Sequence, residues 1–281
     1  MTSGRVQLPP SEHWKAAMQL LAKGEFELGW KLWETRPIEI GGRVSGKPAL
    51  AVPEWDGSDI GSLLILPEQG LGDQIMFARY APLMRDRGVA TTIMCHPLLA
   101  RLFETLGVPV LNAQGRVALP PVDAWALGPS MPYLCGTRPE TIPPAPYLSA
   151  TPRRLGRIGV QASGNPNNPT DVTRSLPPEL AQELLAIPDA FSLEHESTGA
   201  RDLRDTAEII AGADLVIAVD TAVAHLAGAL GKPCWLMIPR QADWRWMRDR
   251  ADSPWYPSIR LFRQPVAGDW ASVVAEVKAA L

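Results

Sequence analysis

The chain alternates short apolar runs with helical segments, and it does so twice. In its first half, apolar runs at 62–66 and 90–95 are each followed by residues with helical spacing. In its second half, the alternation restarts at 157–161 and continues to a helical segment near the C-terminus. Strands that alternate with helices favour right-handed crossovers and parallel sheets. The pattern therefore predicts an α/β fold built from two such units.

The remaining expected elements complete both units. Further strands are predicted at 108–111, 123–127, 190–193, 214–219, 234–238 and 259–262. Helices are predicted at 73–87, 97–106, 177–187, 202–213, 221–230 and in the last residues. Residues 37–61 are rich in glycine and proline and predict an irregular connection.

A proline-rich segment separates the two units. Residues 137–156 contain five prolines, a composition typical of linkers between domains. A chain of 281 residues is long enough to bury two cores. We expect a helical hairpin and connection at 1–50, a first Rossmann-like domain at 51–150 and a second at 151–281. The two domains would face each other across a cleft.

Residues 11–36 predict the N-terminal hairpin. Apolar residues recur at helical spacing on both sides of Gly24, and large aromatic residues lie in both halves. The pair resembles a single tetratricopeptide-type unit, but one repeat cannot bury its faces against neighbouring repeats. Two interpretations stay open. The hairpin is a cap packed on the next domain, which we favour, or a docking site for a protein partner.

Composition excludes several classes of function. The formal net charge of −3 gives no basic surplus, so a nucleic-acid partner is not expected. Three cysteines lack metal-type spacing and suit a reducing compartment. No signal peptide or apolar run of about 20 residues is present. We expect a cytoplasmic protein, with a peripheral position at the inner membrane face as an open alternative.

The most informative segment is DLVIAVDTAVAHLAGALGKP. An apolar strand ends at Val219, and Asp220 is predicted to cap the helix that follows. The helix N-terminus would then lie at the carboxyl edge of a parallel sheet, where free N–H groups suit a phosphate. Thr221 and His225 share one helix face and could both reach a diphosphate. The alternative is a core helix with His225 hydrogen-bonded inside.

This segment resembles the donor-site motif of bacterial heptosyltransferases. The surrounding sequence resembles tetratricopeptide-linked, glycosyltransferase-9-like proteins through several separate motifs. These are EQGLGD at Glu68–Asp73, the element Asp171–Ser175, and the motifs Asp243–Trp246, Ser253–Pro257 and Arg260–Gln264. The resemblance covers about residues 10–281. It implies the GT-B fold, with a nucleotide sugar held mainly by the second domain.

The resemblance also assigns roles in the second domain. It places the cation of Arg174 against the donor diphosphate, where a surface arginine on a loop is the alternative. Backbone N–H groups near Gly164 and Asn165 could form an anion-binding nest, and Glu194 could meet the ribose. Relatives often have Trp-x-Gly where this chain has Gln161 and the three residues after it. This departure bears on the identity of the donor.

The motif EQGLGD joins a strand to a helix in the first domain. Gly70 and Gly72 predict a tight turn, but Ile75 replaces the third glycine of a dinucleotide fingerprint, which argues against NAD. Asp73 is expected to begin the helix and to face the space between the domains. The catalytic aspartate of heptosyltransferases lies at this position. A helix cap without a catalytic role is the alternative.

Together these expectations describe an inverting glycosyltransferase of the hexosyl or heptosyl type. Its donor would be a nucleotide-diphosphate sugar, and its acceptor a glycan, a lipid-linked molecule or a protein. Asp73 would accept a proton, and Arg174, His225 and the helix N-terminus would stabilise the leaving nucleotide. No cofactor or metal is expected, since no D-x-D motif accompanies a donor-site strand. The alternatives are a catalytically inactive GT-B-fold binding or scaffold protein and a sugar-nucleotide epimerase.

Overall fold

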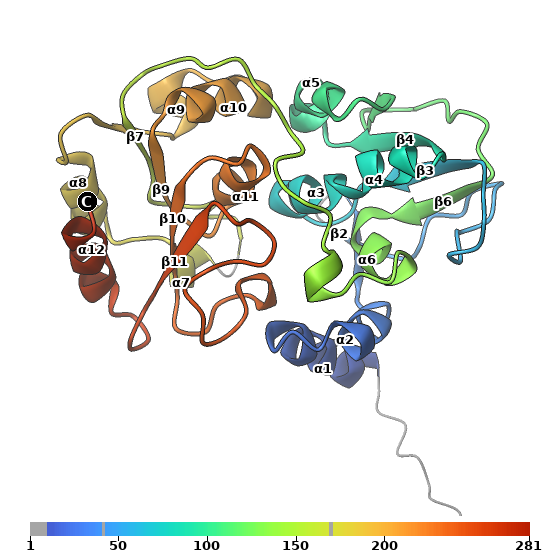
Figure 1. The fold of residues 1–281 in the computed structure, drawn as a ribbon, viewed down its shortest axis with the longest axis horizontal. Coiled ribbons are helices and arrows are strands. Elements are labelled where there is room, and N and C mark those ends of the chain that lie inside the picture. The colour runs from blue at the N-terminus through green and yellow to red at the C-terminus, as the bar shows by residue number, and fades with distance from the viewer. Residues whose placement is uncertain (1–9, 41–42, 169–170) are drawn as a thin grey trace, which may run out of the picture.

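Two parallel β-sheets lie at the centres of two α/β domains (Figure 1). The computed structural model describes residues 10–40, 43–168 and 171–281. The first sheet has the order β5-β4-β3-β6, and the second has the order β11-β10-β9-β7-β8. Among the described residues, all strand pairings within these two sheets are parallel. The predicted α/β class is confirmed, and the two facing parallel sheets give the architecture that the GT-B fold predicts.

The strands follow the apolar runs closely. The first sheet contains β3 (Ser62–Leu66), β4 (Ala90–Cys95), β5 (Val110–Asn112) and β6 (Ala124–Leu127). The second contains β7 (Ile158–Gln161), β8 (Ala190–Ser192), β9 (Leu215–Val219), β10 (Cys234–Ile238) and β11 (Ile259–Arg263). Parallel strands are buried on both faces and so read as continuous apolar runs. This is why the periodicity located them correctly.

Helices connect these strands. In the first domain they are α3 (Leu71–Ala78), α4 (Tyr80–Asp86), α5 (Ala100–Phe103) and α6 (Met131–Leu134). In the second they are α7 (Asp171–Arg174), α8 (Pro178–Leu185), α9 (His195–Thr198), α10 (Leu203–Gly212), α11 (Ala222–Ala229) and α12 (Trp270–Ala279). Short 3₁₀ turns are η1 (Pro97–Leu99), η2 (Glu104–Leu106), η3 (Gly128–Ser130), η4 (Pro139–Thr141) and η5 (Trp244–Trp246). The single helix expected at 73–87 is divided at Arg79.

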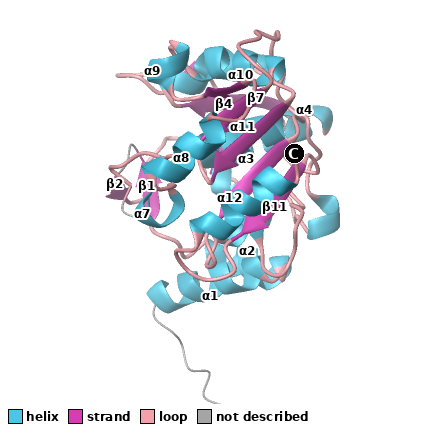
Figure 2. Ribbon diagram, turned by 90° about the vertical axis from the view of Figure 1, so that its left-hand side faces the viewer, coloured by secondary structure: helices cyan, strands magenta, loops and turns pink. Residues whose placement is uncertain are grey.

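Helices cover both faces of the second sheet. Figure 1 shows α10 and α11 on the side toward the first domain. Figure 2, viewed from the outer side, shows α8 and α12 in front of the strands. On this outer side, Val219 and Met237 of the sheet pack in one buried cluster with Val273 of α12. Because both faces are covered, the carboxyl edge of the sheet is the place where strand ends can present polar side chains.

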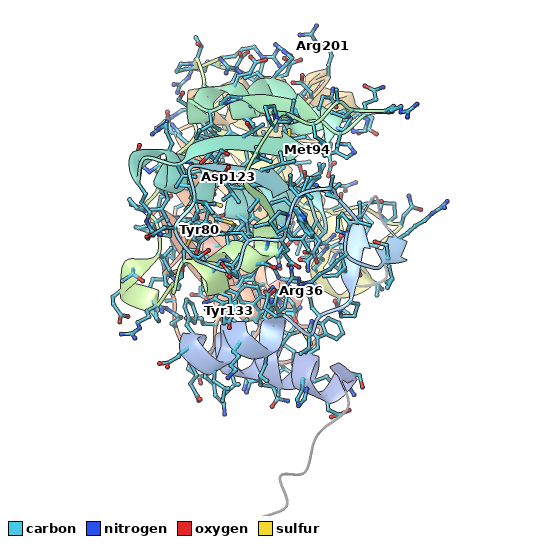
Figure 3. All side chains as sticks on the ribbon, turned by 90° about the vertical axis from the view of Figure 1, so that its right-hand side faces the viewer. Arg36, Tyr80, Met94, Asp123, Tyr133 and Arg201 are labelled. Atoms are coloured by element: carbon cyan, nitrogen blue, oxygen red, sulfur yellow. The ribbon has the colours of Figure 1, made fainter. Side chains whose placement is uncertain are left out.

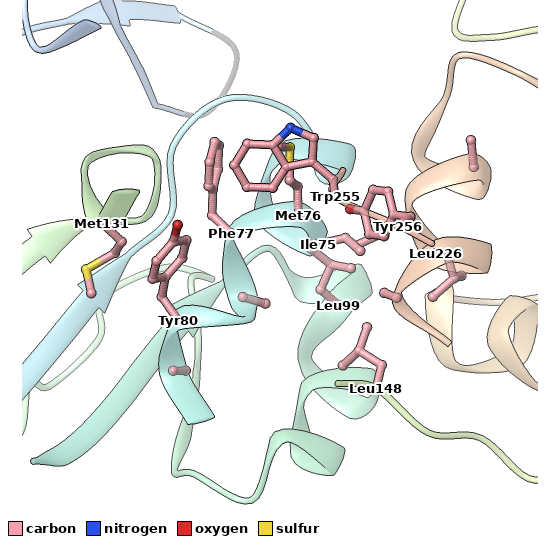
Figure 4. Close-up of a cluster of buried hydrophobic side chains, with 14 of the residues drawn as sticks. Ile75, Met76, Phe77, Tyr80, Leu99, Met131, Leu148, Leu226, Trp255 and Tyr256 are labelled. Atoms are coloured by element: carbon pink, nitrogen blue, oxygen red, sulfur yellow. The ribbon is translucent and has the colours of Figure 1, made fainter. Parts of the chain in front are cut away.

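The two domains share one continuous apolar core. Its buried residues include Ile65 of the first sheet, Leu236 of the second sheet and Leu226 of α11. Figure 4 shows Trp255 and Tyr256, from the segment between β10 and β11, reaching toward Ile75 of α3. Burial of large aromatic side chains across this contact holds the domains together.

The N-terminal hairpin packs against both domains. Its helices are α1 (Pro10–Ala22) and α2 (Phe26–Trp33), and the prediction of two helices is confirmed. The Trp30 ring meets the rings of Trp244 and Trp255 in the second domain, with centroids 5.3 and 6.1 Å apart. The Trp33 Nε1–H donates to the carbonyl of Pro129 in the first domain at 3.1 Å. The aromatic face of the hairpin is therefore buried inside this molecule, as the favoured cap interpretation expected.

The expectation of an irregular connection at 37–61 is wrong for its first part. Strands β1 (Ile38–Ile40) and β2 (Arg43–Ser45) form an antiparallel pair. Ile38 belongs to a cluster with Leu64 and Trp125 on the outer face of the first sheet. Strands of three residues are too short to show a period in the sequence. Among the described residues, no helix is long and apolar enough to cross a membrane.

Candidate functional site

Asp73 lies in the first turn of α3, just after the loop that follows β3. Helix α3 begins at Leu71, with Gly70 as its N-cap residue, so the expectation that Asp73 begins the helix is wrong by two residues. From the third helical position, Asp73 Oδ2 accepts a hydrogen bond from the Gly70 N–H at 3.1 Å. Gln69 has a φ of 63°, an unfavourable backbone conformation for a residue with a side chain. Such conformations gather at functional loops.

Asp73 is bound to an arginine of the second domain. The Arg245 Nη2 group donates to Asp73 Oδ1 in a very close contact. The same nitrogen donates to Gln69 Oε1 at 3.3 Å, and Nη1 donates to Asp243 Oδ1 at 2.8 Å. The guanidinium also stacks on the Trp244 ring at 4.4 Å. The predicted position of Asp73 toward the second domain is therefore correct.

Burial and this arginine act on the Asp73 carboxylate in opposite directions. Burial raises the pKa of Asp73 above its ordinary value, and the Arg245 charge offsets part of that rise. Desolvation disfavours the charged form of an acid, whereas a nearby cation favours it. A carboxyl whose pKa lies above the usual range is better suited to proton transfer near neutral pH.

Helix α11 begins one residue later than its sequence suggested. Thr221 is the N-cap residue, not Asp220, and it takes this position with extended backbone angles. Asp and Thr are both good N-cap residues, so sequence preference alone could not set the boundary to one residue. Thr221 makes no side-chain capping bond, and its Oγ1 atom is buried without a hydrogen-bond partner in the described chain. Burial raises the pKa of Asp220 to about 6.

His225 lies inside the contact between the two domains. Its Nδ1 atom is 3.1 Å from the Tyr256 hydroxyl, and its ring centroid is 5.1 Å from that of Trp246. A Cβ atom on Gly72 would lie 2.8 Å from the His225 ring, so only glycine fits opposite it. Burial first, then the charges of Arg245 and Arg79, hold the pKa of His225 well below its usual value. A lowered pKa favours the neutral ring, which can offer a diphosphate a hydrogen bond but not a positive charge.

Arg174 reaches the start of α11. Its Nη1 group donates to the Asp220 carbonyl at 2.9 Å, and its Nε group donates to Asp171 Oδ1 at 3.0 Å. Arg174 thus contacts the turn before α11 through the Asp220 carbonyl, and its predicted contact with a diphosphate stays a prediction. Since Asp171 also accepts from Ser175 Oγ at 2.9 Å, this arginine is held in a network and is not a free surface side chain.

The expected anion-binding nest is partly occupied by the protein itself. The Gly164 N–H donates to Ser175 Oγ at 2.9 Å. A Cβ atom on Gly164 would lie 2.1 Å from Asp171 Oδ1, which explains the glycine by packing. Asn165 is exposed, and its Oδ1 atom accepts from the Asn167 N–H at 3.0 Å. In this conformation the Gly164 N–H is not available to a phosphate.

The side chains of Glu194 and Gln161 are hydrogen-bonded to each other. Glu194 Oε1 accepts from Gln161 Nε2 at 2.7 Å and from Ser163 Oγ at 2.6 Å. Gln161 ends β7 and Glu194 follows β8, and these two strands are neighbours in the sheet. The glutamine that departs from the family pattern therefore holds the carboxylate that was expected to meet a ribose.

Sequence reasoning missed two buried arginines at the domain contact. Arg245 stands between Trp244 and Trp246, and such aromatic neighbours indicate packing rather than a charged contact. Arg79 is 1% exposed, and its Nη1 group donates to the carbonyls of Pro143 and Trp255, each at 3.0 Å. Both arginines stand within apolar or aromatic runs of the sequence. A charged residue in such a run is the feature from which their burial could have been predicted. Within 10–40, 43–168 and 171–281, no three His, Cys, Asp or Glu side chains are grouped to hold a metal ion.

Comparison with known proteins connects the α11 region to a family of transferases. The fold is of the α/β class, with one parallel sheet in each of two domains. Residues 192–235 match the family described as Glycosyltransferase family 9 (heptosyltransferase). This range contains four of the predicted donor-site residues, namely Glu194, Asp220, Thr221 and His225. The chain is thus related to glycosyltransferase family 9 through this segment.

Similar proteins include one curated relative and several solved structures. The Protein FlbA of Caulobacter vibrioides is 27% identical over 323 residues, which cover 93% of this chain and 53% of that protein. The chain thus spans about half the length of this relative. Escherichia coli ADP-heptose lipopolysaccharide heptosyltransferase II has a TM-score of 0.49 and 13% identity, covering 78% of this chain and 98% of that one. A family 9 glycosyltransferase of Veillonella parvula has a TM-score of 0.46 and 10% identity, covering 80% and 92%.

Proposed function

We propose that this protein is a glycosyltransferase that moves a sugar from a nucleotide-diphosphate sugar to a hydroxyl of a glycan, lipid-linked or protein acceptor. One observation carries the proposal. Asp73 of the first domain meets Arg245 of the second, beside the start of α11, which lies in the segment matched by glycosyltransferase family 9. A base from one domain and anion-binding groups from the other are thereby brought to one place.

The proposed reaction is a single displacement with inversion. Asp73 accepts the proton of the acceptor hydroxyl while that oxygen bonds to the anomeric carbon of the donor sugar. The bond from that carbon to the diphosphate oxygen breaks at the same time, and the nucleoside diphosphate leaves with the electron pair. Arg174, Arg245 and the N-terminus of α11 stabilise the negative charge of the leaving group. Positive charges already supplied by the protein do the electrostatic work for which other systems use a metal.

We expect nucleoside diphosphates to bind without a metal ion. The reason is that two arginines and a helix N-terminus can themselves bind the diphosphate at the proposed site. Calorimetric titration with UDP, ADP and GDP, each with and without EDTA, measures this. Equal affinity in both conditions supports the proposal, and binding that disappears with EDTA contradicts it.

Arg174→Ala should weaken nucleoside diphosphate binding by about tenfold or more, since a charge-assisted contact contributes ~1.5–3 kcal/mol. Its effect on folding should be small because Asp171 keeps its bond from Ser175. Arg157→Ala is the matched control. Arg157 also pairs with an aspartate, Asp214, but it lies just before β7, at the opposite edge of the sheet. If both variants bind like the parent, Arg174 does not contact the diphosphate.

A binding protein without transferase activity is the second candidate. The observation that favours it is the engagement of Asp73, whose two carboxylate oxygens accept bonds from Arg245 and Gly70. A carboxylate held this way in every state could not accept a proton from an acceptor. The two candidates differ in one readout, because both bind nucleotide but only the first consumes a labelled nucleotide sugar.

A further inference from the structure

One edge of the Arg245 guanidinium carries two hydrogen-bond donors, Nε and Nη2, and within the described chain only Nη2 is bonded to another side chain. The side chain is 10% exposed, and its Nη1 group is fixed by Asp243 at 2.8 Å. On the other edge, Nη2 donates to Asp73, while Nε is buried and has no hydrogen-bond partner among the described residues. Asp73 therefore makes a one-point contact with an edge that carries two donors.

The same molecule shows what a filled edge looks like. Arg36 donates from Nε to Glu68 Oε1 at 2.9 Å and from Nη2 to Glu68 Oε2 at 2.6 Å. Such two-point pairing is the usual way in which arginine binds a carboxylate or a phosphate, and it is stronger than a single contact. Because the corresponding edge of Arg245 leaves Nε unpaired, Asp73 is not its best possible partner.

Within the described ranges, one more buried polar atom without a partner lies nearby. Thr221 Oγ1 is at the start of α11, one helical turn before His225. Trp246 is not a further case, because its side chain lies within hydrogen-bonding reach of the Asp220 carboxylate. A buried polar group without a partner costs about 1–3 kcal/mol, so native structures contain few of them. Two such atoms near one helix N-terminus, Arg245 Nε and Thr221 Oγ1, point to a ligand with several acceptor oxygens.

We propose that Arg245 is an exchange residue, which pairs with Asp73 in the nucleotide-free protein and with the diphosphate of a bound nucleotide. The diphosphate takes the Nε and Nη2 donors together, while Asp243 keeps Nη1 in place. Asp73 then loses its cation and becomes free to accept a proton. Donor binding and activation of the base are thus one event. This inference rests on the proposed function. It adds an order of events, in which the nucleotide sugar binds before the acceptor reacts.

The exchange predicts changes in nucleotide affinity that a purely structural ion pair between Asp73 and Arg245 would not produce. Asp73→Asn removes the competitor for Arg245, so UDP, ADP or GDP should bind severalfold tighter than to the parent. Arg245→Gln removes both donors of the edge, so the same nucleotides should bind at least about tenfold weaker. Calorimetry on the full chain gives both values, and melting curves show whether each variant is folded.

The double variant separates exchange from general electrostatics. Removing a negative charge near any anion site raises affinity somewhat, with or without Arg245. If Asp73 acts through Arg245, then Asp73→Asn gives no gain in the Arg245→Gln background. A gain that persists there, or no gain in the single variant, overturns the inference. Should Arg245→Gln not fold, Arg245→Lys keeps a charge but lacks the two-donor edge, and severalfold weaker binding is expected; binding equal to the parent overturns the inference.

The outcomes also distinguish this inference from the proposed function. If the parent binds nucleoside diphosphates and transfers sugar but the variants do not behave as stated, only the exchange is wrong. If the parent binds no nucleoside diphosphate at all, the proposed function fails and the exchange fails with it.

Discussion

Glu68→Ala should lower the free energy of unfolding by about 3 kcal/mol, because it removes the two-point partner of a buried arginine and leaves Glu34, at 2.9 Å, as its remaining counter-charge. The side chains of Glu68 and Arg36 are 0% and 1% exposed and are joined by two hydrogen bonds. Arg36 also donates to Ser130 Oγ at 2.9 Å, and Ser130 donates to Glu34 at 2.9 Å. Figure 3 shows Arg36 where the hairpin meets the first domain. The substitution therefore removes the central carboxylate of the network between hairpin and domain.

Chemical denaturation of the parent and the variant measures this loss. Glu183→Ala is the matched control, since Glu183 pairs with Lys278 at 3.0 Å but both side chains are about half exposed, at 50% and 45%. An exposed pair contributes at most ~1 kcal/mol. A Glu68→Ala variant no less stable than the control would show that the buried network does not hold the hairpin. Replacing Arg36 and Glu68 together by apolar residues of similar volume should cost much less than Glu68→Ala.

The class of fold was accessible from sequence because parallel strands are buried on both faces. Runs such as SLLIL at 62–66 and CWLMI at 234–238 are strands with those same bounds. Their apolar character is a local property of the chain and does not depend on which elements lie beside them. The helices between them were also located, although their ends shifted by one to a few residues. Capping preferences are shared by several residue types, as the change from Asp220 to Thr221 at α11 shows.

The pairings that build the site were not accessible in the same way. Asp73 and Arg245 are 172 residues apart, and the motif around either residue does not indicate that the other is its partner. His225 was expected to reach toward a ligand. The position of its ring depends on Gly72 of the other domain, which leaves room for it. Glu68 lies in the EQGLGD motif that carries the family resemblance, yet it pairs with the hairpin. Contacts between distant segments depend on the packing of whole domains, whereas a sequence motif reflects only the structure of its own segment.

Asp73→Asn should lower the rate of sugar transfer by at least about a hundredfold, since a general base contributes typically ~10²–10⁴ in rate. Asparagine keeps the shape of the side chain and can accept the hydrogen bond from Gly70, but it cannot take up the acceptor proton. Folding should be nearly unchanged. Burial raises the pKa of Asp73, so the charged carboxylate is disfavoured in the folded protein, and a neutral amide removes that cost while it loses the ion pair. Nucleotide binding should persist, and it should be severalfold tighter if Asp73 competes with the diphosphate for Arg245.

Asp123→Asn supplies the control for this prediction. Asp123 Oδ2 accepts from the N–H groups of Gly61 and Ser62, both at 2.8 Å, so it too is a carboxylate that holds backbone N–H groups. It precedes β6 and lies at the amino edge of the sheet, opposite the edge that carries Asp73. Transfer from a labelled nucleotide sugar should therefore fall in Asp73→Asn and stay at the parental rate in Asp123→Asn. Parental transfer by Asp73→Asn would remove this residue from the mechanism. If the parent binds nucleotide but transfers no sugar from any donor, Asp73 is a helix residue that pairs with Arg245, and the protein is a binding protein on this fold.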